Sequence, residues 1–214
     1  MKIVNVIVDS FIECAPFNWG LTLFSYGCNL SCSMCKGYNY ESVTNENNVQ
    51  GNAIELIKDN ITPAHDTVIF LGGEPTIHGD KLIEALQYCK DMNLKTKIFT
   101  NGTCSSLVEK INEMKLCDSW SVDLKCTSYT VDSIGDYDSA IYMNALFNTI
   151  VNIMGNGLPL EIRTTFHEGN FRDMHDLTKI GNDLINGYKK SNPEVYSKYI
   201  VQKDARKDRI INNN

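Results

Sequence analysis

Three cysteines lie close together near the start of the chain. Cys28, Cys32 and Cys35 are spaced four and three residues apart and follow Gly27. Thiolates are soft ligands that suit zinc, copper(I) and iron–sulfur clusters. A cubane cluster held by only three cysteines leaves one iron atom open to a substrate or cofactor. The triplet therefore favours an iron–sulfur cluster with these three cysteines as its metal ligands.

A zinc site is the alternative for this triplet. Structural zinc sites usually take four ligands, commonly as two separated pairs, and no partner pair is evident here. A zinc knuckle would need one distant ligand, taken from His65, His78, His167 and Cys104. The remaining cysteines are scattered and form no second spaced set: Cys14, Cys89, Cys117 and Cys126.

A glycine-rich turn follows the apolar segment 67–71, which we predict to be a strand. The turn consists of Gly72, Gly73, Glu74 and Pro75. Its two glycines would let main-chain groups approach a ligand closely. Glu74 offers an acceptor for an ammonium group, and Pro75 fixes the exit of the turn.

Polar residues also lie in or just after the next three predicted strands: Asn101, Asp123, Lys125 and Arg163. A strand has a period of two residues, so Asp123 and Lys125 share one face. One such pair at a strand end is usually a solvated salt bridge of small value. Arg163 inside a barrel would need an anionic partner, either a ligand carboxylate or Glu161 or another carboxylate of the chain.

The chain alternates short apolar segments with longer amphipathic ones. We predict strands at 3–8, 21–26, 67–71, 95–100, 119–124, 160–166 and 199–201. We predict helices at 53–58 with a start near 48, and at 81–92, 104–114, 140–154 and 173–185. This alternation implies an α/β fold of about six strand–helix units after an extra N-terminal strand. Functional residues of such folds lie at the carboxyl ends of strands, where these motifs fall.

Composition limits the class of protein. The 214 residues fit one domain that needs no disulfides to build a core. The formal net charge of −6 argues against a nucleic-acid partner. Residues 1–10 lack a signal-peptide pattern, and the apolar run 3–8 is too short to cross a membrane. We therefore expect a cytoplasmic protein whose 8 cysteines stay reduced.

The cysteine triplet after a first barrel strand, followed by the Gly-Gly-Glu-Pro turn, resembles the signature of the radical S-adenosylmethionine superfamily. The resemblance implies a partial (β/α)6 barrel over the single domain 1–214, with its core at about 20–202 and a tail at 203–214. It also implies one [4Fe-4S] cluster, whose open iron binds the amino and carboxylate groups of S-adenosyl-L-methionine. One electron then splits the sulfonium into methionine and a 5′-deoxyadenosyl radical.

The resemblance also gives the other motif residues expected roles in binding the cofactor. The turn from Gly72 to Pro75 is similar to the motif that holds the methionine amino group, and Asn101 lies near the cofactor. Asp123 and Lys125 are similar to the Asp-x-Lys motif of glycyl-radical activating enzymes. There the lysine contacts the cofactor, so we expect Lys125 to be catalytic together with the cysteines, and the aspartate helps to form a monovalent-cation site. Arg163 is expected at the cofactor carboxylate.

The resemblance is strongest to activating proteins of anaerobic ribonucleoside-triphosphate reductase and to pyruvate formate-lyase activating enzyme. It implies hydrogen abstraction from a backbone glycine of a partner enzyme, with electrons from a donor such as flavodoxin or ferredoxin. The chain departs from this group in two places. Lys36 and Gly37 stand before Tyr38-Asn39, where activators often have His-Asn or Tyr-Asn, and Phe99 replaces the Asp before Thr-Asn-Gly.

Two other functions stay open. A 7-carboxy-7-deazaguanine synthase, which acts on a small metabolite, shares the chain length, the triplet and the Gly-Gly-Glu-Pro turn. The segments Asp123-Leu124-Lys125 and Arg163-Thr164-Thr165 favour the activator instead. A zinc-stabilised binding module is the hypothesis from outside the enzymes.

Overall fold

One 8-stranded sheet organises residues 1–11, 13–36 and 40–203, which this computed structural model describes. Its strand order is β3-β1-β2-β4-β5-β6-β7-β8. The strands are β1 (Lys2–Ser10), β2 (Gly20–Ser25), β3 (Gly51–Asn52), β4 (Thr67–Gly72), β5 (Lys95–Thr100), β6 (Ser119–Asp123), β7 (Leu160–Phe166) and β8 (Ser197–Lys203). From β2 to β8 all neighbours are parallel, and β1 runs antiparallel to β2.

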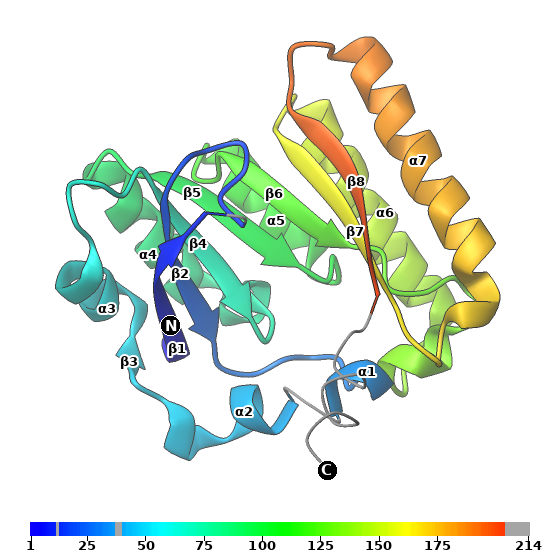
Figure 1. Ribbon diagram of the computed structural model, residues 1–214, viewed down its shortest axis with the longest axis horizontal. Coiled ribbons are helices and arrows are strands. Elements are labelled where there is room, and N and C mark those ends of the chain that lie inside the picture. The colour runs from blue at the N-terminus through cyan, green and yellow to red at the C-terminus, as the bar shows by residue number, and fades with distance from the viewer. Residues whose placement is uncertain (12, 37–39, 204–214) are drawn as a thin grey trace.

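This topology confirms the predicted α/β class, a partial barrel with an extra N-terminal strand. Because β3 and β8 end the strand order, the barrel is open (Figure 1). The helices are α1 (Ser33–Lys36), α2 (Tyr40–Thr44), α3 (Ala53–Asn60), α4 (Asp80–Asp91), α5 (Ser105–Glu113), α6 (Ser139–Gly155) and α7 (Met174–Ser191). Short 3-10 turns are η1 (Glu46–Asn48), η2 (Pro75–His78), η3 (Val131–Ile134) and η4 (Phe171–Asp173).

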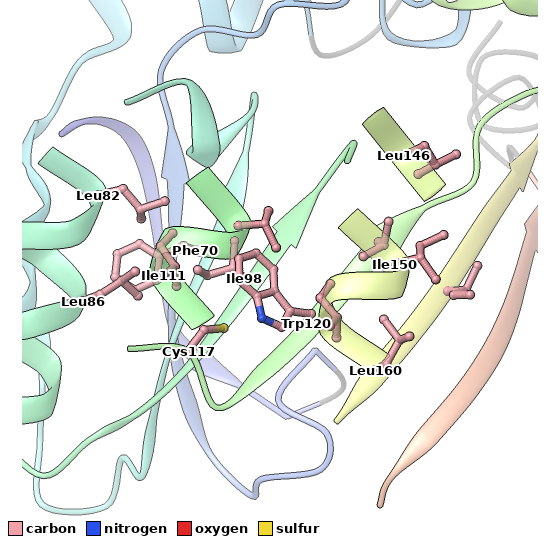
Figure 2. Packing of buried hydrophobic residues seen from close by; sticks show 14 of the residues in the cluster. Phe70, Leu82, Leu86, Ile98, Ile111, Cys117, Trp120, Leu146, Ile150 and Leu160 are labelled. Carbon is pink, nitrogen blue, oxygen red and sulfur yellow. The ribbon is translucent and has the colours of Figure 1, made fainter. Parts of the chain in front are cut away.

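The main core lies between the sheet and the crossover helices. Alternate residues of each strand face the helices, as a period of two requires. Figure 2 shows side chains of β4, β5, β6 and β7 against those of α4, α5 and α6: Phe70, Ile98, Trp120 and Leu160 against Leu82, Leu86, Ile111, Leu146 and Ile150. All nine are fully enclosed, and the burial of a large apolar side chain stabilises the fold by roughly 1.5–3 kcal/mol. Cys89 is enclosed in the same core, as a small hydrophobe.

The segment that connects β1 to β2 covers the amino ends of the parallel strands. Cys14 packs with Ile69 and Phe99 on the inner face of the barrel. Lys97 Nζ donates to the Ala15 carbonyl at 2.7 Å. At the start of β4, Asp66 accepts hydrogen bonds from the backbone of this segment. This segment therefore covers the end of the open barrel that lies opposite to the cysteine triplet.

Several elements differ from the sequence predictions. The helix expected to start near residue 48 begins at Ala53, because the Asn52 side chain accepts from Glu55 N at 3.0 Å and caps it. The pairing of β3 with β1 was not predicted, because two residues carry no period. His65, named above as a possible zinc ligand, is buried, and Thr62 N donates to its Nδ1 at 2.9 Å. Tyr38-Asn39 lie outside the described residues.

Candidate active site

A cavity of about 160 Å3 lies at the carboxyl ends of the strands β2, β4, β5 and β6. It gathers nine of the residues singled out in the sequence: Cys28, Cys32, Cys35, Gly72, Gly73, Glu74, Asn101, Asp123 and Lys125. Apolar and other side chains complete its walls: Leu30, Met34, Val43, Leu71, Phe99 and Thr100. The cavity thus brings together residues from four separate segments, as expected for the carboxyl ends of parallel strands.

The two glycines serve a backbone contact that the sequence did not reveal. Gly73 N donates to Ser25 O at 3.0 Å, and Glu74 N donates to Gly27 O at 2.8 Å. A Cβ on Gly73 would lie 1.8 Å from Gly27 O, and one on Gly72 would lie 2.4 Å from Ser25 N. Both positions therefore need glycine, because the turn after β4 packs directly on the loop that carries the cysteines.

Glu74 is buried and held by its own chain. Its Oε1 accepts hydrogen bonds from the Thr76 and Thr100 hydroxyls at 2.6 and 2.8 Å. Its Oε2 accepts from Asn101 N at 2.6 Å. Burial raises the pKa of this carboxyl, and the hydrogen bonds oppose that rise. These donors fix the position of the carboxylate at the wall of the cavity.

The three cysteines lie on the loop after β2 and on α1. Burial raises the pKa of Cys28 to about 11 and raises that of Cys32. A metal would therefore have to displace their protons on binding. Within the described residues, no three Cys, His, Asp or Glu side chains converge on a point that one metal ion could occupy. In a [4Fe-4S] cluster each thiolate binds a separate iron atom, so its ligands are spread over a larger group.

Asp123 and Lys125 form an ion pair at the rim of the cavity, although β6 ends at Asp123 and Lys125 lies two residues beyond it. Lys125 Nζ donates to Asp123 Oδ2 at 2.6 Å. Burial opposes the charge on Lys125, but Asp123 and the nearby Cys32 hold the pKa of Lys125 above its usual range. The Lys125 side chain is 19% exposed and the Asp123 side chain is 36% exposed, so the pair is accessible from the cavity.

Arg163 and Pro75 do not line the cavity. Arg163 Nη1 donates to Glu13 Oε2 at 2.7 Å, and its guanidinium lies 4.9 Å from the Phe99 ring centroid. The anionic partner that Arg163 needs is thus a carboxylate of the chain itself. Pro75 is the first residue of η2, and the Glu74 side chain caps this turn by accepting from Thr76 N.

The candidates for a fourth zinc ligand are dispersed around the fold. Cys104 precedes α5 at the N-cap position without a side-chain capping bond, and His167 is buried with Gly169 N donating to its Nδ1 at 3.1 Å. His78 is half-buried, with its Nε2 2.8 Å from Tyr26 O. None of the four candidates lines the cavity that holds the cysteines.

Several residues of the site were missed in the sequence. The hydroxyls of Thr76 and Thr100 donate to Glu74, and Thr100 precedes Asn101 in the Thr-Asn-Gly tripeptide. Asn170 is fully buried, and its Nδ2 donates to Lys125 O at 2.7 Å. No local pattern marks Asn170, because it lies 45 residues from the backbone that it supports.

The fold and the cavity define a class of protein. The Radical SAM superfamily matches residues 22–174, so the chain belongs to this superfamily. Enzymes of this superfamily use a [4Fe-4S] cluster and S-adenosylmethionine. In the described part of the chain, every helix is too short or too polar to span a bilayer.

Two known proteins are similar to parts of this chain. The protein named "Putative glycyl-radical enzyme activating enzyme" of Methanocaldococcus jannaschii is 29% identical over 170 residues, which are 77% of this chain and 68% of the relative. The 7-carboxy-7-deazaguanine synthase of Methanothermobacter thermautotrophicus is 30% identical over 114 residues, 50% of this chain and 42% of that enzyme.

A solved structure shares the fold. Native anSMEcpe with bound AdoMet superposes with a TM-score of 0.51 at 17% identity, over 83% of this chain and 49% of that one. The chain therefore spans about half the length of that protein. At this identity the likeness shows the fold alone.

Proposed function

We propose that this radical S-adenosylmethionine enzyme generates a glycyl radical on a partner enzyme. The observation that carries the proposal is the 29% identity to the Methanocaldococcus jannaschii protein over 77% of this chain. The Asp123–Lys125 pair at the cavity supports it, since this pair resembles the Asp-x-Lys motif of activating enzymes. The substrate would then be a backbone glycine of a protein.

The residues of the cavity fit the cofactors of the superfamily. Cys28, Cys32 and Cys35 supply three soft ligands in one cavity, which suits a cluster with one open iron. When bound, the cluster and S-adenosylmethionine supply a 5′-deoxyadenosyl radical that abstracts hydrogen. Glu74 offers a fixed carboxylate to the ammonium group of the cofactor.

The remaining cavity residues are suited to bind the cofactor and to shield it from water. Lys125 is the cation suited to an anionic group of the cofactor, and Asp123 beside it holds its charge and is the candidate ligand for a monovalent cation. Leu71, Phe99 and Met34 line the cavity with apolar surface, which excludes water from a reactive radical. Arg163 would reach the cofactor carboxylate only by leaving Glu13.

The partner that we propose is an anaerobic ribonucleoside-triphosphate reductase, with an electron donor such as flavodoxin or ferredoxin. The strand Arg163-Thr164-Thr165 supports this choice through its resemblance to activators of that reductase. We propose that residues 1–214 act as one domain in this reaction, because a single sheet joins β1 to β8.

Anaerobic mixing with a candidate reductase tests the function. The reconstituted protein, S-adenosylmethionine and dithionite are expected to produce a glycyl radical signal in electron paramagnetic resonance. A reductase whose radical-site glycine is replaced by alanine is the matched control and should give no signal. Release of 5′-deoxyadenosine without a glycyl radical on any candidate reductase would reject the activator function but not the chemistry.

The second candidate is a 7-carboxy-7-deazaguanine synthase, favoured by the 30% identity to the Methanothermobacter thermautotrophicus enzyme over 114 residues. That match covers 50% of this chain, which is less than the first relative covers. Incubation with 6-carboxytetrahydropterin separates the two functions. Turnover of this metabolite would reject the activator, and no turnover would reject the synthase.

A further inference from the structure

Three side chains beside the cavity form a closed ring of hydrogen bonds. Asn101 Nδ2 donates to Asn29 Oδ1 at 2.9 Å, and Asn29 Nδ2 donates to Thr103 Oγ1 at 2.8 Å. Thr103 Oγ1 closes the ring by donating to Asn101 Oδ1 at 2.6 Å. Asn29 comes from the cysteine loop, and Asn101 and Thr103 come from the loop that follows β5. The ring therefore ties the first cysteine of the triplet to the sheet.

The ring fixes the orientation of the Asn101 amide. The backbone N–H of Thr103 also donates to Asn101 Oδ1, at 3.0 Å, and a backbone N–H can only donate. Oδ1 must therefore face Thr103, and the NH2 group must face the cysteine loop. One of its two hydrogens reaches Asn29, which leaves the other for a second acceptor.

That second acceptor is the sulfur of Cys28. Asn101 Nδ2 lies 4.0 Å from Cys28 Sγ, and Leu30 N donates to the same sulfur at 3.4 Å. Asn101 is 3% exposed, so little water competes for this contact. Cys28 thus receives one donor from its own loop and one from the neighbouring strand end.

We propose that Asn101 is a positioning residue that raises the reduction potential of the cluster through its hydrogen bond to Cys28. Reduction places more negative charge on the cluster and its thiolates. Donors to sulfur therefore stabilise the reduced form more than the oxidised form. The ring holds the amide in place before the electron arrives, so no reorganisation is needed at reduction. This inference rests on the cluster of the proposed function but not on the glycyl-radical partner.

The variant Asn101→Ala, reconstituted anaerobically, tests this contact. The readout is the midpoint potential of the cluster in a spectroscopic redox titration without S-adenosylmethionine. We expect a more negative potential, with the reduction equilibrium about tenfold weaker, which is about 59 mV for one electron. Asn112→Ala is the matched control, because Asn112 is also buried and bonded, to Asn152 at 2.7 Å, but lies outside the cavity. Its potential should equal that of the wild type.

Asn29→Ala and Thr103→Val break the ring and keep the Asn101 amide. We expect both to lower the potential less than Asn101→Ala does, because the amide is then free to turn. Unchanged potentials in loaded variants would overturn the inference. Loss of the cluster from all three variants would also overturn it, since the ring would then serve assembly rather than tuning. Wild-type protein without iron and sulfide would instead reject the cluster of the proposed function.

Discussion

The two ends of the open barrel differ in the surroundings of their charged and polar side chains. At the amino end, Lys97 Nζ lies 2.9 Å from Glu161 Oε2, and this pair is almost fully enclosed. Glu13, from the segment that connects β1 to β2, pairs with Arg163. At the carboxyl end, Glu74 and the three cysteines face a cavity that the chain does not fill. At the amino end the charged groups are paired with one another, whereas at the carboxyl end an open cavity remains beside them.

This difference shows why burial of a charge does not by itself mark a functional residue. Lys97 is as deeply buried as any residue of the site, and burial lowers its pKa while Glu161 opposes the shift. Its donors are directed to Glu161 and to Ala15 O, both from the chain. Glu74 is equally buried, but it lines the cavity. The free space next to a fixed charge, rather than its burial, distinguishes the candidate binding residue Glu74 from Lys97.

Removal of a proposed cluster ligand at the carboxyl end should have the largest effect. In Cys32→Ala the cluster loses one of three thiolates, so we expect iron, sulfide and cofactor cleavage to be lost almost completely. Metal and sulfide analysis of anaerobically reconstituted protein measures this. Cys104→Ser is the control, since Cys104 lies outside the cavity, and it should keep its cluster. Full cluster content in Cys32→Ala, or one zinc without sulfide in the wild type, would contradict the assignment.

Removal of one partner at the amino end should reduce stability instead. Lys97→Met takes the lysine away from the enclosed Glu161 carboxylate and leaves it the Tyr196 hydroxyl as a donor, which we expect to cost about 3–5 kcal/mol of unfolding free energy. Denaturant unfolding measures this loss. The double variant Lys97→Met/Glu161→Leu removes both charges and should recover most of the stability. If Lys97→Met weakened S-adenosylmethionine binding without destabilising the fold, the amino end would belong to the site.

Glu74→Gln should affect cofactor binding more than stability. The neutral amide loses the charge that an ammonium group needs, and its NH2 group would face a donor such as Asn101 N. A hydrogen bond to a charged group contributes about 1.5–3 kcal/mol, so we expect roughly a tenfold to hundredfold higher Kd for S-adenosylmethionine. Equilibrium dialysis with the reconstituted protein measures it. The exposed variant Glu109→Gln is the control, and a Kd within about twofold in Glu74→Gln would remove Glu74 from the binding site.

The sequence predicted the parts of the molecule that depend on local pattern. The alternation of strands and helices gave the barrel, and residues at strand ends gave most of the cavity. It did not reveal the partner of Arg163, because Glu13 lies 150 residues away in a segment without period. The need for Gly73 was visible, but its reason, the packing on Gly27, required coordinates. Pairings across the fold follow from topology, which a local pattern does not specify.

The smallest effect concerns pH and the amino end. Asp118 precedes β6 and accepts from Lys90 Nζ at 2.7 Å and from Thr96 N at 2.9 Å. Burial opposes its charge, but these hydrogen bonds hold the pKa of Asp118 below its ordinary value. A depressed native pKa means that the unfolded chain binds more protons, so Asp118 stabilises the fold fully above about pH 4 and loses this effect as the pH falls through its native pKa.

Asp118→Asn should therefore be less stable than the wild type by about 1 kcal/mol at neutral pH, and this difference should shrink towards about pH 2. Urea unfolding of cluster-free protein at a series of pH values measures it, because acid loss of the cluster then plays no part. Asp80→Asn is the matched control, since Asp80 pairs with Lys110 on the exposed surface, where an ion pair contributes little. A difference that is independent of pH would mean that Asp118 acts through its shape rather than its charge. The charged groups of the amino end would then matter less for the fold than their burial implies.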